Sequence, residues 1–120
     1  MTQIHDTAVV SNKATIGDNV VISPYAIIED DVVIGNDCLI GPHAIIYNGA
    51  RIGNRVKIGQ GASVSNLPQD LSYKGQETHF FVDDDTTLRE FVTLHKGTTS
   101  GYSRVGKNCY LMAYTHVGHD

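Results

Sequence analysis

Residues 4–64 read IHDTAVVSNKATIGDNVVISPYAIIEDDVVIGNDCLIGPHAIIYNGARIGNRVKIGQGASV and carry a strict six-residue repeat. Every sixth residue of this stretch is Ile or Val, over eleven consecutive positions: Ile4, Val10, Ile16, Ile22, Ile28, Ile34, Ile40, Ile46, Ile52, Ile58 and Val64. Two positions before each of them from Val10 onward lies a small or compact residue, such as Ala14 or Cys38. One or two positions after them, glycines and other turn-forming residues recur.

A period of six does not fit an α-helix, whose apolar stripe recurs about every 3.6 residues, but it fits a short strand followed by a corner. Strand side chains alternate, so the small residue and the Ile two positions later both point inward. Gly and Asn at the corner tolerate the positive φ of a tight bend. Three strands then close a coil of about 18 residues, and the coils stack as a parallel β-helix. Ile4, Ile22, Ile40 and Ile58 are predicted to form one inward stack.

The repeat breaks twice. Residues 66–79 are polar and contain Pro68 and Gly75, which predicts a loop that leaves the solenoid at a corner. Inward positions resume at Val82, and a second break covers about residues 96–104 before they resume at Val105. We expect residues 1–120 to form a single domain. Because the sequence stops in mid-repeat at Asp120 with no capping unit, we also expect this domain to be truncated at its C-terminal end.

Val9, Ile27 and Ile45 occupy outward positions on one side of the predicted coil. Such an aliphatic strip predicts a partner surface, and a second copy of the chain is the hypothesis; lightly exposed strand residues would be the alternative.

Composition narrows the class of protein. The 120 residues carry a net charge of −4, with acidic and basic residues interspersed, so nothing favours nucleic-acid binding. No apolar segment approaches the length of a membrane span, and no signal pattern opens the chain. We therefore expect a soluble, cytoplasmic protein with no integral membrane segment.

Three histidines lie close together late in the sequence: His95, His116 and His119. Asp120 follows His119, and a carboxylate beside an imidazole can orient it as a general base. Two other interpretations remain open on these residues alone, a catalytic zinc held by the three imidazoles and a passive surface corner.

Three blocks of sequence resemble one enzyme family, the acyl-carrier-protein-dependent UDP-N-acetylglucosamine O-acyltransferases that begin lipid A synthesis. The blocks are residues 69–75 (QDLSYKG), residues 88–98 (LREFVTLHKGT) and residues 111–120 (LMAYTHVGHD). This resemblance implies a left-handed coil, which the periodicity does not reveal. It also implies a homotrimer with active sites between subunits, and a C-terminal continuation of the chain.

The resemblance implies transfer of a 3-hydroxyacyl chain from acyl carrier protein to the 3-hydroxyl of UDP-N-acetylglucosamine, without metal or cofactor. By position, His119 would be the general base and Asp120 would orient it. The substrate-binding residues would be Gln69, Asp70, Ser72, Lys74, His95 and His116. The family usually has Lys at the position of Ser72, where it would meet a phosphate of the nucleotide, and Lys74 is the candidate substitute. Because further parts of the family's site lie beyond position 120, we expect the 120-residue chain alone to be nearly inactive.

Two alternatives remain. The chain could belong to a sibling hexapeptide acyltransferase that acts on another amino- or nucleotide-sugar. It could also be a non-catalytic β-helix scaffold, in which His119 is a passive corner residue.

Overall fold

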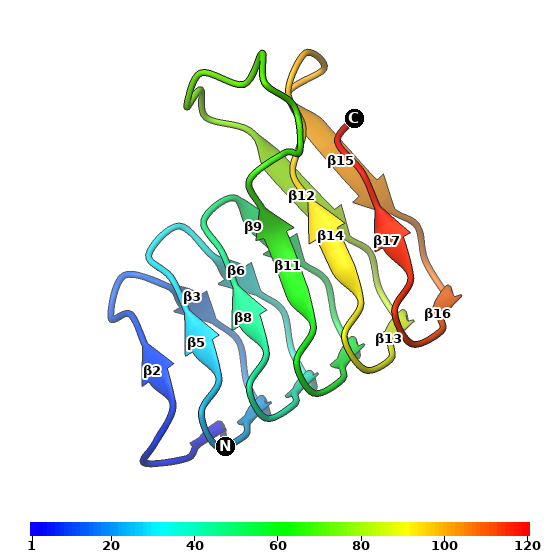
Figure 1. The fold of residues 1–120 in the computed structure, drawn as a ribbon. Coiled ribbons are helices and arrows are strands. Elements are labelled where there is room, and N and C mark those ends of the chain that lie inside the picture. Colours follow the sequence, from blue (N-terminus) through cyan, green and yellow to red (C-terminus); the bar gives the residue numbers. More distant parts are fainter.

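The computed structural model describes all 120 residues, which form an all-β solenoid of 17 strands (Figure 1). The strands make three parallel sheets, each built from every third strand. Sheet A contains β1 (Gln3–Ile4), β4 (Val21–Ile22), β7 (Leu39–Ile40), β10 (Lys57–Ile58), β13 (Thr87–Leu88) and β16 (Tyr110–Leu111). Sheet B contains β2 (Val9–Val10), β5 (Ile27–Ile28), β8 (Ile45–Ile46), β11 (Ser63–Asn66), β14 (Thr93–His95) and β17 (His116–Val117). Sheet C contains β3 (Thr15–Ile16), β6 (Val33–Ile34), β9 (Ala50–Ile52), β12 (His79–Val82) and β15 (Tyr102–Val105).

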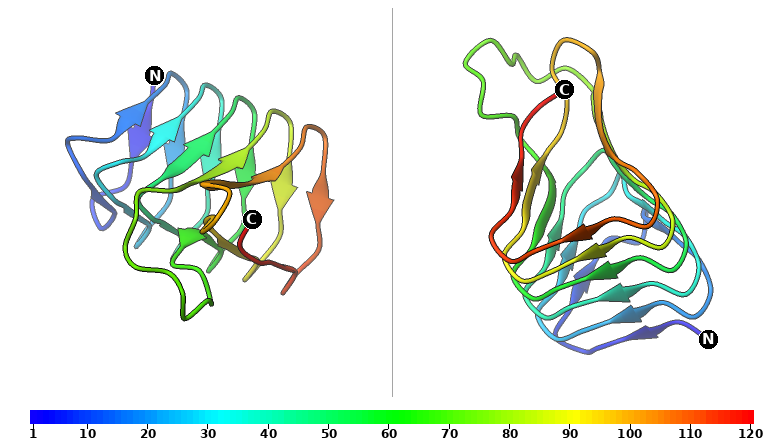
Figure 2. Two further views of the ribbon diagram at one scale, coloured as in Figure 1. Left: turned by 90° about the horizontal axis from the view of Figure 1, so that it is seen from above. Right: turned by 90° about the vertical axis from the view of Figure 1, so that its right-hand side faces the viewer.

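The coil is left-handed, as the family resemblance implied. The right-hand view of Figure 2 shows the solenoid with its C-terminal coil nearest the viewer. The chain runs clockwise from β15 through β16 to β17 as it approaches, which is the sense of a left-handed helix. No element of the chain is a helix long and apolar enough to cross a membrane.

The core is the predicted stack of inward residues. Ile4 pairs in register with Ile22, Ile22 with Ile40, and Ile40 with Ile58. The small residues two positions earlier are also inward, and Ala26, Ala44 and Ala62 are fully buried. Because each inward side chain packs on its counterpart in the neighbouring coil, the interior of the solenoid is one continuous cluster of 22 buried residues.

The prediction of positive φ at the corners is correct for Asn19, Gly49 and Gly61 but wrong for the glycines that directly follow the inward residue. Positive φ occurs three positions after the inward residue, for example at Asn19, Asp37 and Arg55, and not at the glycines one position after it. Those glycines are required by close stacking: a Cβ on Gly35 would lie 2.7 Å from the carbonyl oxygen of Gly53 in the next coil. The absence of a side chain therefore lets neighbouring corners approach each other.

Asparagine side chains connect the corners in the same region. The Oδ1 atom of Asn36 accepts the N–H of Asp18 at 2.9 Å, and Oδ1 of Asn54 accepts the N–H of Asn36 at 2.8 Å. Asp84 continues this ladder by accepting the N–H of Asn54 at 2.7 Å. The ladder satisfies backbone donors that the corner would otherwise leave unpaired, which explains the recurrence of Asn at this position.

Both predicted breaks are excursions from the corner between sheets B and C. Residues 67–78 connect β11 to β12, and residues 96–101 connect β14 to β15. Figure 1 shows the two excursions projecting side by side from one edge of the solenoid, close to residue 120. The corner between sheets B and C is therefore where the predicted site residues collect.

Exposed apolar side chains are most frequent on sheet A and on the corner that joins it to sheet B. The predicted strip is present, because Val9, Ile27 and Ile45 pair in register on the outer face of sheet B. Further large exposed apolar residues lie on sheet A or on the corner that joins it to sheet B, among them Val21, Tyr25, Leu39, Phe91, Tyr110, Met112 and Tyr114. Leu67 and Leu71 are exposed on the first excursion. Sheet C exposes only Val33 and Tyr102 among such residues.

Candidate active site

His119 lies between two carboxylates at the corner that follows β17. Its Nδ1 atom is 3.2 Å from Oδ2 of Asp120, and its Nε2 atom is 3.8 Å from Oδ2 of Asp70. Asp70 comes from the first excursion, so stacking of the coils brings these three residues together from distant parts of the sequence. The imidazole remains partly accessible, with 38% of its side-chain surface exposed.

The carboxylate of Asp120 is held by the second excursion. Its Oδ1 atom accepts the N–H of Thr98 at 2.8 Å, the N–H of Ser100 at 3.1 Å and the hydroxyl of Ser100 at 2.6 Å. Its Oδ2 atom accepts the hydroxyl of Thr98 at 2.5 Å and the N–H of Thr99 at 3.2 Å. The hydroxyl donors of Ser100 and Thr98 hold the pKa of Asp120 far below its ordinary value, so this carboxyl is ionised at neutral pH.

Asp70 is fixed by Ser72, within its own excursion. The N–H and the hydroxyl of Ser72 both donate to Oδ1 of Asp70, at 2.9 and 2.8 Å. These two hydrogen bonds lower the pKa of Asp70, the one from the backbone contributing most. Asp70 is thus a second anion, with Oδ2 directed at His119.

His95 and His116 lie on adjacent strands of sheet B. Their rings meet edge to face with centroids 4.8 Å apart, and Nδ1 of His116 is 2.9 Å from the hydroxyl oxygen of Thr93. His95 is only 6% exposed, and its Nδ1 atom has no hydrogen-bond partner. Burial lowers the pKa of His95 and the nearby His116 lowers it further, so His95 is neutral at pH 7.

Two of the predicted residues stand apart from this cluster. Gln69 and Lys74 are exposed and their side chains make no hydrogen bond within the chain. Lys96, which the sequence did not single out, is only 9% exposed, and its Nζ atom lies 5.9 Å from the centroid of the Tyr73 ring. The buried cation beside the first excursion is therefore Lys96, whereas Lys74 faces solvent.

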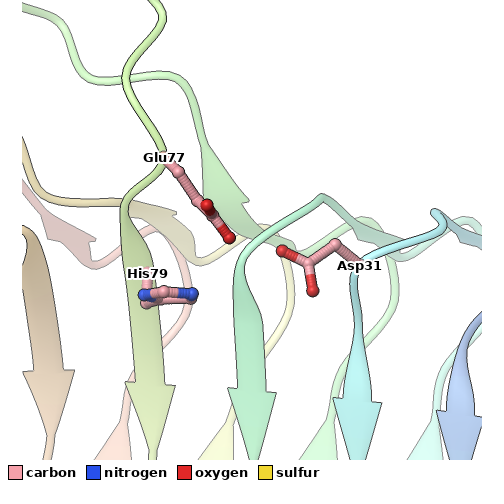
Figure 3. A group of neighbouring side chains, drawn as sticks. All are labelled: Asp31, Glu77 and His79. Atoms are coloured by element: carbon pink, nitrogen blue, oxygen red, sulfur yellow. The ribbon is translucent and has the colours of Figure 1, made fainter.

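The three histidines do not form a metal-ligand set. The chain's one group of three potential ligand atoms within 4.8 Å of one another is Asp31, Glu77 and His79, on the sheet C side of the first excursion. Figure 3 shows the Glu77 carboxylate directed toward the gap between His79 and Asp31. Asp31 already pairs with Arg51 at 2.7 Å, however, so part of its charge is neutralised. We assign no metal to this group.

The arrangement is suited to removing a proton from a substrate. A carboxylate on Nδ1 orients an imidazole and stabilises its protonated form, while Nε2 on the other side can accept a proton. No Ser or Cys lies within hydrogen-bond distance of an imidazole nitrogen, so the residues present favour a direct transfer over a covalent enzyme intermediate.

The chain is similar in sequence to known bacterial acyltransferases. Residues 31–66 match the family model described as bacterial transferase hexapeptide (six repeats). The whole chain is 62% identical to the acyl-(acyl-carrier-protein)–UDP-N-acetylglucosamine O-acyltransferase of Chlorobium phaeobacteroides, of which it covers 46%. It is 54% identical to the protein of the same name from a Sulfurihydrogenibium species, of which it covers 45%.

The fold is also closely similar to a solved structure. The UDP-N-acetylglucosamine acyltransferase of Bacteroides fragilis superposes with a TM-score of 0.96 at 41% identity, over 98% of this chain and 46% of that one. The chain therefore spans about half the length of the relatives that it matches.

Proposed function

This chain belongs by sequence to the family of acyl-(acyl-carrier-protein)–UDP-N-acetylglucosamine O-acyltransferases, and we propose that in its full-length form it catalyses that acyl transfer. The donor is an acyl chain on acyl carrier protein, and the acceptor is the 3-hydroxyl of UDP-N-acetylglucosamine. The single observation that carries the proposal is the position of His119 between the carboxylates of Asp120 and Asp70.

The proposed mechanism is a single displacement. Nε2 of His119 takes the proton of the acceptor hydroxyl as the hydroxyl oxygen attacks the thioester carbonyl carbon. Asp120 stabilises the imidazolium that forms, at a distance of 3.2 Å from Nδ1. The C–S bond then breaks, and the leaving thiolate takes the proton from the imidazolium, so an ester and a free thiol result. The proton is passed on within one active site, and no group on the enzyme is acylated.

The remaining site residues are proposed to bind the acceptor. Oδ2 of Asp70, whose other oxygen is engaged by Ser72, is free to accept a hydrogen bond from the sugar. His95 and the exposed His116 lie on adjacent strands of sheet B and are proposed to contact the acceptor as well. Gln69 and Lys74, which have no partners within the chain, remain candidates for contacts with the rest of the nucleotide. Ser72 serves Asp70, so it supplies no positive charge for a phosphate.

A homotrimer is part of the proposal. Sheet A and the corner that joins it to sheet B expose several aliphatic or aromatic side chains, and sheet B carries the strip of Val9, Ile27 and Ile45 on its outer face. A closed ring of copies in which sheet B of one subunit faces sheet A of the next would cover both surfaces. Such packing would also bring a second subunit toward His116, which lies on the outer face of sheet B. We also propose a cytoplasmic location for the protein, because its proposed substrates are an acyl carrier protein and a nucleotide sugar.

The test is acyl transfer from an acyl carrier protein thioester to UDP-N-acetylglucosamine by the full-length protein, with a chelator present. We expect transfer that survives the chelator and falls by a factor on the order of 100 or more in His119→Ala. Arg55→Ala, which removes a surface ion pair with Asp85 far from the site, is the control and should retain full activity. Transfer to a different amino-sugar in place of UDP-N-acetylglucosamine would identify a sibling enzyme. Transfer that is indifferent to His119, or absent with every acceptor, would contradict the proposal.

A further inference from the structure

We propose that Thr98 and Ser100 are positioning residues that hold Asp120 so that His119 is fixed as the tautomer with its proton on Nδ1, which leaves Nε2 as the basic nitrogen. Their part in catalysis rests on the function proposed above. The tautomer itself is a property of the chain and can be measured without any substrate.

The excursion that carries these residues is closed at its base. The N–H of Gly97 donates to the carbonyl of His79 at 3.4 Å, and the N–H of His79 donates to the carbonyl of Gly101 at 3.0 Å. Both ends of the excursion are thus tied to one residue of β12. Gly101 has a φ of +85°, and a Cβ on Gly97 would lie 2.7 Å from the backbone of Tyr102, so both glycines are needed for this closure.

The closed excursion surrounds the carboxylate of Asp120 with donors. Five hydrogen bonds reach its two oxygens from residues 98–100, three of them from backbone N–H groups and two from hydroxyls. The Ser100 hydroxyl is shared between Oδ1 of Asp120 and the carbonyl oxygen of Tyr102. Rotation of the carboxylate would break several of these bonds together. Oδ2 is therefore held at its distance of 3.2 Å from Nδ1 of His119.

The protonation of Nδ1 follows from the groups around it. Oδ2 of Asp120 is a carboxylate oxygen and can only accept. The other neighbour is the hydroxyl oxygen of Thr98, 3.4 Å from Nδ1. The single proton of that hydroxyl is directed at Oδ2 of Asp120, so toward Nδ1 this oxygen too can only accept.

Two acceptors around one nitrogen require that nitrogen to be the donor. With the proton on Nε2 instead, the lone pair of Nδ1 would face Oδ2 of Asp120 at 3.2 Å, which is repulsive. With the proton on Nδ1, the lone pair of Nε2 points to the side of the ring where Asp70 lies and where the acceptor hydroxyl is proposed to bind. The excursion therefore selects the one neutral form of His119 that can act as a base toward the substrate.

The experiment compares variants of the full-length protein labelled with ¹⁵N-histidine, at a pH where the imidazoles are neutral. Long-range ¹H–¹⁵N correlation reports which nitrogen of His119 is protonated, and the transfer assay is run on the same samples. Thr98→Val removes the hydroxyl but keeps the shape, Thr98→Ser keeps the hydroxyl, and Thr98→Val with Ser100→Ala removes both. Thr15→Val makes the same chemical change at an exposed position of β3 and is the matched control.

We expect His119 to be protonated on Nδ1 in the unaltered protein, in Thr98→Ser and in Thr15→Val. In Thr98→Val we expect a mixture of tautomers and a kcat reduced about tenfold or more with little change in KM, and a larger loss in the double variant. Protonation on Nε2 in the unaltered protein, or an unchanged tautomer and kcat in the double variant, would overturn the proposal. If no variant or parent transfers an acyl group but the tautomer still depends on Thr98, the positioning role stands and the proposed function fails.

Discussion

Oδ2 of Asp70 lies 3.8 Å from Nε2 of His119, on the opposite side of the imidazole from Asp120. The two carboxylates differ in how they are held. Asp120 is saturated by donors from the second excursion, whereas Asp70 accepts from Ser72 through Oδ1 and directs Oδ2 at His119. This difference suggests different roles, with Asp120 acting on the base and Asp70 acting on the substrate.

Replacing Asp70 by Asn should therefore weaken binding of the acceptor more than it slows the acyl-transfer step. Loss of a charged hydrogen bond to the sugar is expected to raise KM for the acceptor roughly 10-fold to 100-fold. The value of kcat should fall less, because His119 and Asp120 remain paired. Steady-state kinetics of the full-length protein measure both values, with Asp85→Asn as a control carboxylate in a surface ion pair. A collapse of kcat with an unchanged KM would instead place Asp70 in the proton transfer.

A charge on the outer face of sheet B should disrupt association of subunits. Ile27→Glu places a carboxylate in the aliphatic strip, and we expect the trimer to dissociate because burying that charge is unfavourable. Val33→Glu is the matched control, because Val33 on sheet C is 38% exposed and Ile27 is 39% exposed. Light scattering gives the molar mass of each variant. Equal masses for the Ile27 variant and the parent would remove sheet B from the interface.

Adding a methyl group to a stacked corner should destabilise the solenoid. In Gly35→Ala the new Cβ would lie 2.7 Å from the carbonyl oxygen of Gly53, and such overpacking costs about 1–3 kcal/mol. In the 120-residue chain, Gly106 occupies the same position of the repeat, but a Cβ there would have no other atom within 4 Å, so Gly106→Ala in this chain should change stability by less than about 0.5 kcal/mol. Urea denaturation measures both free energies. A similar loss in the two variants would show that backbone flexibility, and not stacking, determines the preference for glycine.

Stability should fall in mild acid because of His95. Burial and the neighbouring His116 and His119 lower the pKa of His95 in the folded chain, so the unfolded chain binds a proton first as the pH decreases below about 6.5. The free energy of unfolding should thus decrease from about pH 7 to about pH 5.5, and the slope should be smaller in His95→Gln. Denaturation at several pH values measures the slope, and His5→Gln changes an exposed histidine for comparison. Identical slopes for the parent and His95→Gln would contradict this account.

The six-residue pattern predicted the solenoid correctly because each inward position, such as Ile22 or Ile40, is specified by its own residue. It also located both excursions, since polar residues with Pro68 or Gly97 cannot continue the inward stack. Positive φ was predicted correctly for corner residues such as Gly49 and Gly61. The role of the glycines directly after the inward residue was predicted incorrectly, because it depends on the distance between stacked coils, which the sequence of one repeat does not reveal.

The donors to Asp120 were not predictable in the same way. Thr98 and Asp120 lie 22 residues apart, which is not the spacing of stacked coils, because the second excursion adds residues between them. Residues 88–98, which include Thr98, resemble one family of enzymes, but this resemblance assigns no role to the hydroxyl of Thr98. Only the folded path of the excursion brings residues 98–100 around a carboxylate.

The closure of the second excursion on His79 has a consequence for how such sites can diversify. Because both ends of this segment are hydrogen-bonded to the same residue, His79, the length of the segment between Gly97 and Gly101 can change while β14 and β15 keep their places in the stack. Mutations in this segment can therefore change the surroundings of His119 without changing the hydrophobic interior of the solenoid. A designer could graft a segment of different length between those two glycines, provided that it again donates hydrogen bonds to Asp120, while the repeat that builds the solenoid stays unchanged.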